Sequence, residues 1–164
     1  MLLQLKDVFL NEGSSQQFDY SLPMNEIDIG GDYPFKSPVS VHASAVNRAG
    51  LVELFVDAVF DYTTRCDRCF EPMVKHMELS FTHGLATELI DELNDDYIET
   101  PDYTLELDDV VISDILLNLP SKNLCREDCR GLCLYCGQNL NNGACACQKQ
   151  DVDSRLEILK QLID

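Results

Sequence analysis

The eight cysteines are the residues of this chain best suited to chemistry, and they form two groups. The first is Cys66-Asp-Arg-Cys69, in which two residues separate a pair of cysteines. The second group holds the other six, between residues 125 and 147. Four thiolates around one ion give the closed tetrahedral coordination that is typical of structural zinc sites. The sequence therefore predicts one or two bound zinc ions.

The spacing alone leaves the assignment of ligands to each ion open. We prefer two sets of four, one within a compact loop and the other joining the first pair to the start of the second group. The first set is Cys133, Cys136, Cys145 and Cys147, and the second set is Cys66, Cys69, Cys125 and Cys129. A single occupied site is the alternative, since only one residue separates Cys145 from Cys147.

The residue after each Cys-x-x-Cys pair also bears on metal binding. A turn that points two thiolates at one ion often needs a positive φ after the second cysteine, which glycine adopts most readily. Gly137 follows Cys136 and meets this requirement, whereas Phe70 follows Cys69. The second pair therefore has the more typical knuckle sequence.

Other chemistries of the same thiols are less favoured. Four cysteines on one ion leave no coordination position open for substrate, so metal catalysis is not expected. The spacing does not match the common ferredoxin runs, and neither pair stands at a helix start in a βαβ unit, as a redox dithiol would. The sequence has no glycine-rich phosphate loop, and the strand-like stretches around His42, His76 and His83 predict surface histidines rather than ligands.

Half of the chain's twelve basic residues flank the cysteines. If the cysteines converge, these side chains form a small basic face that could contact a partner or RNA. Alternatively, they only offset the negative charge of the thiolates. The six residues are Arg65, Arg68, Lys75, Lys122, Arg126 and Arg130.

The whole chain is strongly acidic, with 29 acidic and 12 basic residues and a net charge of −17. This charge repels nucleic acids and anionic membranes, so a contact with RNA would have to be local or made through a protein. A length of 164 residues with 45% apolar residues is typical of one globular domain with a small appendage. No apolar run suits a membrane span, and residues 1–10 do not resemble a signal peptide, so we expect a cytoplasmic protein.

The elements that must position the cysteines predict an α+β fold. Residues 2–9 suggest one opening strand. Apolar and polar residues then alternate over residues 39–45, 51–64 and 77–82, with short turns between them. This period of two predicts an antiparallel β-meander, or a small barrel-like sheet, with one buried face.

An acidic stretch and a helix follow the strands. Residues 86–114 contain eleven acidic residues and no lysine or arginine, which indicates a solvated connection. Asp108 is the expected N-cap of a helix that ends before Pro120. Its apolar stripe, which we expect to pack on the sheet, consists of Val111, Ile112, Ile115, Leu116 and Leu119.

These elements divide the chain into three segments. Residues 1–120 form the α+β core, which includes the first cysteine pair. Residues 121–149 form a cysteine-rich zinc-knuckle segment, and residues 150–164 form a C-terminal helix with its leucines on one side. Zinc would stabilise a segment that is too poor in apolar residues to build its own core.

Two runs of residues carry a resemblance to a known family. Residues 65–72 (RCDRCFEP) and 119–147, which contain CRGLCLYCGQNLN, are similar to the YceD family of bacteria and plastids, the large ribosomal RNA subunit accumulation proteins. The closing DVDSRLEILKQL also resembles the end of that family. Leu134 and Ser154 stand where the family often has proline, and neither difference affects a cysteine.

The resemblance implies a non-enzymatic role in the accumulation of 23S rRNA and the biogenesis of the large ribosomal subunit. The implied partner is a large-subunit ribosomal protein or the 23S rRNA precursor, with no membrane and no small-molecule substrate. We favour a protein partner, because the net charge of −17 opposes contact with RNA. The alternatives are a thiol or redox protein and a zinc-responsive regulator that use the same cysteines.

Overall fold

The computed structural model describes residues 1–88 and 97–147, which cluster into two compact units. Unit 1 comprises Met1–Arg65 and Pro72–Asn123, and unit 2 comprises Cys66–Glu71 and the residues from Leu124 onward. The chain thus leaves unit 1 for the first cysteine pair and then returns to it. The predicted boundaries at residues 120 and 149 stay predictions, and the helix predicted for residues 150–164 lies outside the described residues.

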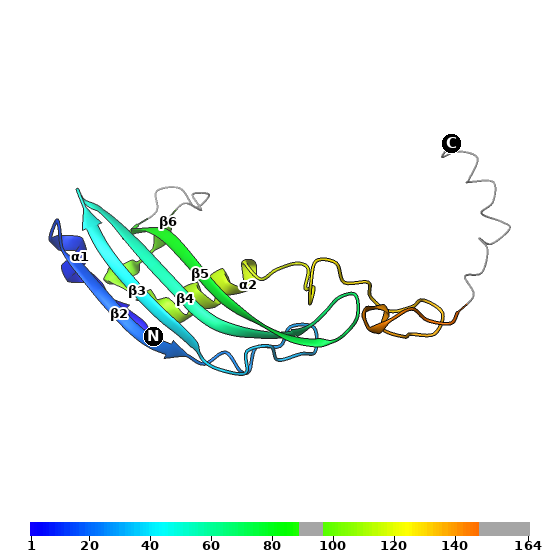
Figure 1. Cartoon of the computed structure of the whole chain (residues 1–164). Helices are drawn as coiled ribbons and strands as arrows, with labels where there is room; N and C mark the ends of the chain where they lie inside the picture. The colour runs from blue at the N-terminus through cyan, green and yellow to red at the C-terminus, as the bar shows by residue number, and fades with distance from the viewer. Residues whose placement is uncertain (89–96, 148–164) are drawn as a thin grey trace, which may run out of the picture. The chain divides into compact units, whose positions relative to one another are not determined.

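Unit 1 is built on a curled five-stranded sheet with the strand order β2-β3-β4-β5-β6 (Figure 1). Neighbouring strands from β2 to β5 are antiparallel, whereas β6 pairs with β5 in parallel, so the sheet is mixed. The α+β class is confirmed, and the parallel edge strand was not predicted. The strands are β2 (Ser15–Leu22), β3 (Val39–Arg48), β4 (Leu51–Arg65), β5 (Pro72–Ala86) and β6 (Tyr97–Glu99).

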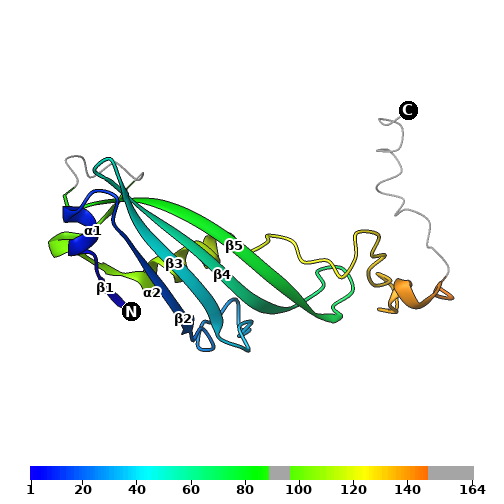
Figure 2. The ribbon, with the colours of Figure 1, turned by 60° about the vertical axis from the view of Figure 1, so that its left-hand side comes forward.

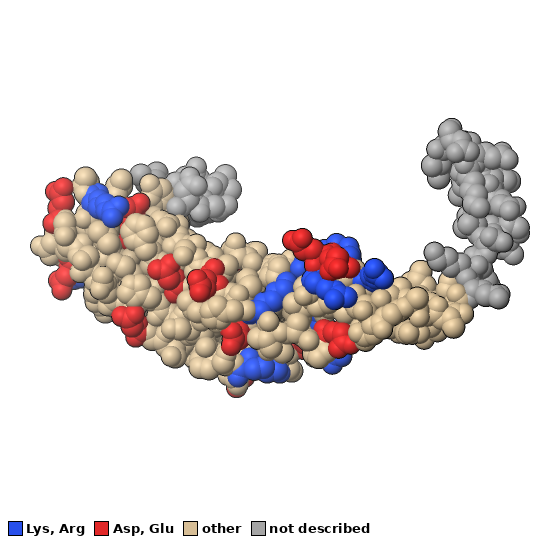
Figure 3. Space-filling model, in the orientation of Figure 1, with Lys and Arg blue, Asp and Glu red and all other residues tan. Residues whose placement is uncertain are grey.

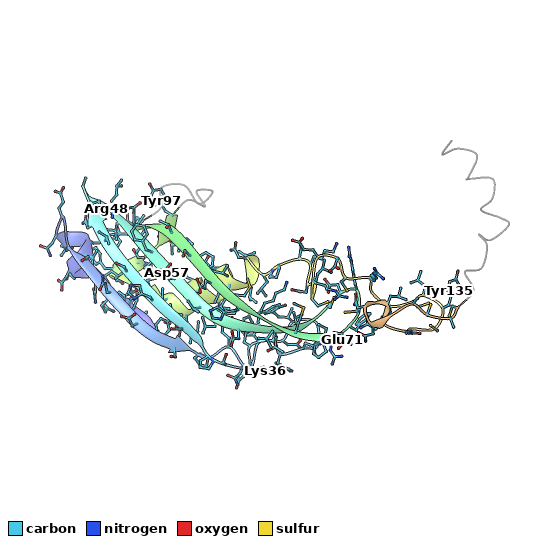
Figure 4. All side chains as sticks on the ribbon, viewed as in Figure 1. Lys36, Arg48, Asp57, Glu71, Tyr97 and Tyr135 are labelled. Atoms are coloured by element: carbon cyan, nitrogen blue, oxygen red, sulfur yellow. The ribbon has the colours of Figure 1, made fainter. Side chains whose placement is uncertain are left out.

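The alternation of apolar and polar residues explains why these strands form a sheet with one buried face. Every second residue from Val39 to Ala45 is buried in β3, and every second residue from Val52 to Tyr62 is buried in β4. Asp57, which Figure 4 labels, lies between two of these buried positions and is exposed. Because successive side chains of a strand point to opposite faces, one face becomes core and the other meets solvent.

Two helices and a small second sheet complete the core of unit 1. Helix α2 (Leu107–Leu117) runs along one side of the five-stranded sheet in both Figure 1 and Figure 2. Its buried residues are Leu107, Val111 and Ile115, which join the strand residues in one hydrophobic cluster. The remaining elements are β1 (Leu2–Gln4), α1 (Lys6–Leu10), the 3₁₀ helix η1 (Pro101–Tyr103) and β7 (Thr104–Glu106), which pairs with β1. No helix of residues 1–88 and 97–147 is long and apolar enough to cross a membrane.

Four features of unit 1 differ from the predictions. The opening segment is not one strand, because β1 ends at Gln4 and α1 follows. Strand β2 was missed because only Leu22 of its eight residues is buried. Helix α2 begins two residues earlier than predicted, with Glu106 rather than Asp108 at the N-cap. Leu116 of the predicted stripe is 38% exposed, because the buried row runs through every fourth residue from Leu107.

The described part of the acidic stretch, residues 86–88 and 97–114, is not the solvated connection that was predicted, and residues 89–96 lie outside the described residues. Its described part from residue 97 onward contains β6, η1, β7 and the start of α2. Thr100 is fully buried, and both its N–H and its hydroxyl donate to the carbonyl of Ala86, at 2.7 and 3.0 Å. Glu99, Glu106 and Asp109 are exposed, while Leu105 and Leu107 enter the core. The acidic composition therefore gave no sign of the strands and helices in this stretch.

Asn47 is a buried polar residue that ties α1 to the sheet. Its amide nitrogen donates to the carbonyls of Val8 and Phe9 at 2.8 and 3.2 Å. Its Oδ1 accepts a hydrogen bond from the N–H of Gly50 at 3.0 Å. The side chain thus satisfies carbonyls at the end of α1 and closes the turn between β3 and β4.

We expect Asn47→Ala to lower the free energy of unfolding by about 2 kcal/mol, since it leaves buried backbone groups without partners. Urea unfolding of the whole chain measures this loss. The matched control is Asn11→Ala, which removes a similar bond, from Asn11 to the carbonyl of Asp7 at 2.9 Å, in an exposed position. The control should cost less than about 1 kcal/mol because water replaces the lost donor. Equal losses in the two variants would contradict the assignment.

Candidate metal centres

Unit 2 gathers all eight thiols into two groups of four. Within each group the sulfur atoms lie within 4.8 Å of one another, and all eight cysteines are free of disulfides. The groups are Cys66, Cys69, Cys125 and Cys129, here termed cluster A, and Cys133, Cys136, Cys145 and Cys147, here termed cluster B. They are the two sets preferred on sequence grounds, and each could hold a metal ion.

The spacing of the sulfurs fits a tetrahedral ion. With a zinc–sulfur bond of about 2.3 Å, two ligands at corners of a tetrahedron are about 3.8 Å apart. In cluster A two sulfur pairs are separated by 3.8 and 3.7 Å, and in cluster B one pair is separated by 3.4 Å. A disulfide bond would need about 2.05 Å. The thiols are therefore arranged around a shared point rather than bonded to one another.

The two Cys-x-x-Cys loops have the same backbone hydrogen bonds. In cluster A the N–H of Phe70 donates to the carbonyl of Cys66, and the N–H of Cys66 donates to the carbonyl of Glu71, both at 2.9 Å. The loop of cluster B repeats these bonds at its equivalent residues, at 2.9 and 2.8 Å. The two loops are thus copies of one turn that directs both of its thiols to the same side.

The residue after the second cysteine has a positive φ in both loops, at 72° for Gly137 and 59° for Phe70. A residue with a Cβ is strained there by about 1–2 kcal/mol. Because the side chain of Phe70 is 61% exposed, packing returns little of this strain. The absence of glycine after Cys69 therefore did not prevent the turn.

We expect Phe70→Gly to stabilise unit 2 by up to about 1 kcal/mol. The relief of backbone strain is larger than this, but the greater entropy that glycine gives the unfolded chain offsets part of it. Urea-induced metal release from the zinc-loaded protein, followed with a chromophoric chelator, would measure the change. Phe70→Ala is the control, because it removes the ring but keeps the strained backbone. A glycine variant less stable than the alanine variant would show that the strain is not relieved.

One thiol in each cluster ionises more readily than its neighbours. Burial opposes ionisation of Cys66, but backbone N–H groups, including those of Cys125 and Cys69, lower its pKa to about 6. In the same cluster, burial and the neighbouring sulfurs raise the pKa of Cys125 to about 12. In cluster B, the N–H groups of the Cys-x-x-Cys loop lower the pKa of Cys133 to about 6. Full ionisation of four adjacent thiols therefore requires a cation.

These pKa values predict how metal retention depends on pH. The pKa of Cys66 and that of Cys133 lie near 6, below the ordinary 9.0. The stability that these two ionised thiols give the folded state is complete above a pH of about 9. It declines as the pH falls and is lost below a pH of about 6. Because thiolates are the ligands and bound zinc keeps them ionised, the zinc-loaded protein should hold its metal at neutral pH and release it only in the acidic range, below a pH of about 6. Titration with a zinc indicator tests this, and release of the metal already at pH 7 or above would contradict it.

Asn141 supports cluster A and was not singled out from the sequence. Its Nδ2 donates to the sulfur of Cys129 at 3.3 Å, and this bond lowers the pKa of the Cys129 thiol. Its Oδ1 accepts from the N–H of Arg130 at 2.9 Å, and its own N–H donates to Oδ1 of Asn139 at 3.0 Å. Such outer contacts orient metal ligands. The only signal in the sequence was the turn-forming Asn-Asn-Gly run.

The six basic residues flanking the cysteines are divided between the units. Arg68 is engaged within unit 2, because its Nη1 donates to the carbonyls of Cys129 and Glu127 at 2.8 and 3.4 Å. A single basic face that contacts a partner or RNA stays a prediction. Arg65, Lys75 and Lys122 belong to unit 1, and Arg68, Arg126 and Arg130 belong to unit 2.

None of the three histidines belongs to a cysteine cluster. His42 and His76 are exposed and pair across neighbouring strands with Asp19 and Asp61, whose carboxylates raise the pKa of each imidazole. His83, also on a strand, is partly buried, and its Nε2 lies 2.7 Å from a carboxylate oxygen of α2. All three histidines thus lie on strands, as predicted.

The chain is similar to proteins of one family. Residues 56–163 match the family model described as large ribosomal RNA subunit accumulation protein YceD. One relative is the large ribosomal RNA subunit accumulation protein YCED homolog 1, chloroplastic, of Zea mays. The two sequences are 24% identical over 182 aligned residues, and the alignment covers 92% of this chain and 62% of the maize protein. It is 33% identical over 76 residues to an uncharacterized protein of Mycobacterium tuberculosis, or 44% of this chain and 37% of that protein. The chain thus spans less than two thirds of the length of these curated relatives. No solved structure matches.

Proposed function

The chain belongs to the YceD family of large ribosomal RNA subunit accumulation proteins, and we propose from this that it supports the accumulation of 23S rRNA during assembly of the large ribosomal subunit. The observation that carries the proposal is the match over residues 56–163, a range that contains α2 and all eight cysteines. The protein acts by binding and catalyses no reaction, because a four-thiol site leaves no position open for substrate.

Both clusters hold zinc in this proposal. Sulfur spacings near those of a zinc tetrahedron support it, and so does the gathering of eight free thiols into two groups of four. Free thiols in this number suit a reducing compartment, which is why we place the protein in the cytoplasm. Elemental analysis should find about two zinc ions per folded chain. A folded, metal-free protein with eight titratable thiols would refute the zinc sites.

The partner in this proposal is a basic protein of the large ribosomal subunit rather than naked 23S rRNA. The described residues of unit 1 carry 17 acidic and six basic side chains, a net charge of −11. Figure 3 shows acidic groups spread over the visible face of unit 1. Such a surface attracts cationic proteins and repels phosphates.

Depletion of the protein in its host tests the proposed function. We expect 23S rRNA to fall relative to 16S rRNA and large subunits to fall relative to small subunits in a sucrose gradient. Wild-type protein supplied from a plasmid should restore both, which excludes an effect on neighbouring genes. Unchanged rRNA ratios and a normal subunit profile after complete depletion would refute the role.

A thiol or redox function is the second candidate, because the pKa of Cys66 and that of Cys133 lie near 6. This function requires a cysteine that reacts quickly in the metal-loaded protein. Alkylation followed by mass spectrometry separates the two candidates. Slow and uniform alkylation until a chelator is added excludes the redox function, whereas one fast thiol in the loaded protein favours it.

A further inference from the structure

The tip of the cluster B loop exposes two large apolar side chains. These are Leu134 and Tyr135, the residues between Cys133 and Cys136. Leu134 is 99% exposed and Tyr135 is 59% exposed. Figure 4 labels Tyr135, which projects from the ribbon of unit 2. A single exposed leucine is ordinary in a folded protein, so the tip becomes informative only by comparison with its counterpart.

The loop of cluster A supplies that comparison, because it has the same backbone bonds but a polar tip, Asp67 and Arg68. The guanidinium of Arg68 turns back into unit 2, where it donates to the carbonyl of Cys129 at 2.8 Å. The carbonyl of Arg68 accepts from the N–H of Leu132 at 3.1 Å. One tip is therefore used within the fold, and the turn does not require apolar residues at this position. The apolar pair of the other tip needs a different explanation.

A groove of about 610 Å³ lies beside the apolar tip, entirely within unit 2. This volume falls within the range of about 300–1,000 Å³ that is usual for binding pockets. Three cysteines of cluster B and Arg130 contribute to its lining, and among the described lining residues Arg130 is the one arginine or lysine, with no aspartate or glutamate. The apolar side chains of the groove are Leu132, Leu134, Tyr135, Leu140 and Ala144.

The negative charge around this groove favours a cationic partner over an anionic one. The described residues of unit 2 carry four acidic and three basic side chains, and the whole chain has a net charge of −17. Four thiolates around a divalent ion add a formal charge of about −2 at the edge of the groove. This field repels the phosphates of RNA. A lysine or arginine beside an apolar segment would instead be attracted, and could donate to the sulfurs.

We propose that Leu134, Tyr135 and the adjacent groove form a docking surface for an apolar segment flanked by lysine or arginine in a cationic protein. The inference rests on the proposed function for one point only, the identification of that protein as a component of the large ribosomal subunit. The two exposed side chains anchor the contact, while the segment's apolar side chains fill the groove. Large apolar anchors of this kind carry much of the affinity of protein interfaces.

Photocrosslinking from the tip identifies the occupant. p-Benzoylphenylalanine replaces Leu134 in the full-length, zinc-loaded chain, and Leu117, which is 84% exposed on α2, is the matched control position. The probes are salt-extracted proteins of the large ribosomal subunit and, separately, protein-free 23S rRNA. We expect position 134, and not position 117, to crosslink to a protein segment that contains apolar residues flanked by lysine or arginine.

Other crosslinks would overturn the proposal. Crosslinks from position 134 to 23S rRNA alone would make the tip an RNA contact. Crosslinks to residues 148–164 of the same chain would make the groove an internal docking site. Crosslinks to a second copy of the chain would make it a dimer interface.

A double variant, L134D/Y135D, tests the strength of the contact. Its zinc content and circular dichroism should match those of the wild type, because both side chains are exposed. We expect its affinity for the crosslinked ribosomal protein to fall by about tenfold or more, with no change for Leu117→Asp. If the aspartates lower the zinc content, Leu134→Ser with Tyr135→Ser replaces them. Unchanged affinity in the folded variant would overturn the proposal.

Host assays separate failure of this inference from failure of the proposed function. A depletion that lowers 23S rRNA and is fully rescued by L134D/Y135D would leave the function standing and refute the docking surface. A depletion without effect on rRNA, together with tip-dependent binding of a basic protein, would refute the ribosomal role and keep the surface. Loss of rescue by the double variant, with rescue by Leu117→Asp, supports both.

Discussion

Cys129→Ser should remove the metal ion of cluster A and unfold unit 2 while unit 1 keeps its sheet. Cys129 is buried, and its cluster draws ligands from Cys66–Glu71 and from the segment after Leu124. An ion held by both segments joins parts of the chain that are far apart in sequence. Structural zinc contributes about 10–16 kcal/mol of apparent binding free energy in small zinc-binding peptides. The few apolar residues of unit 2 cannot supply a stabilising free energy of this size when the ion is lost.

The matched variant is Cys136→Ser, which removes an exposed ligand of cluster B. All ligands of cluster B lie between residues 133 and 147, so its loss should leave cluster A and the segment 66–71 intact. Zinc analysis should find about one ion in C136S and at most one in C129S. Limited proteolysis should cut C129S at both segments of unit 2, and C136S only near the second knuckle. Equal protection of the segment 66–71 in the two variants would contradict the joining role of cluster A.

The sequence predicted the long strands well because each of them carries its own pattern. The strand expected over residues 51–64 is β4, from Leu51 to Arg65, and its alternation can be read without neighbouring strands. Short elements lack such a pattern. α1 has five residues, and β6 has three and pairs in parallel with the end of β5, which only the tertiary fold decides. The acidic residues of 97–114 were misleading, because the apolar residues between them carry the structural information.

The two sets of cysteines could be predicted because few ways of dividing eight cysteines between two ions give each ion a pair of cysteines that are close in sequence. The contacts that support them could not, since they depend on segments that meet only after folding. Arg68 looked like a surface cation, yet its guanidinium closes onto the carbonyl of Cys129. Phe70 looked less suited to a knuckle than Gly137, yet it adopts a φ of 59°. Composition rules describe average costs, and a turn fixed by two hydrogen bonds can sustain one strained residue.

Gly131→Ala should strongly destabilise unit 2. Gly131 has a φ of 72°, and a Cβ at this position would lie 2.9 Å from the carbonyl oxygen of Arg68. That oxygen also accepts the N–H of Leu132 at 3.1 Å, and the carbonyl of Gly131 accepts the N–H of Leu140 at 2.9 Å. Backbone atoms held on both sides cannot move aside. Strain and collision together should cost about 3 kcal/mol, or about a hundredfold in the zinc affinity of cluster A.

Gly137→Ala separates the collision from the strain. Gly137 also has a φ of 72°, but no atom lies within 4 Å of the position that its Cβ would take. This variant should therefore lose only about 1 kcal/mol, or about fivefold in metal affinity, and the loss should affect cluster B. Competition of each zinc-loaded variant with a chelator of known affinity measures both effects. Similar losses in the two variants would mean that the chain does not pass as closely over Arg68 as the structure has it, and that backbone strain alone sets the requirement for glycine.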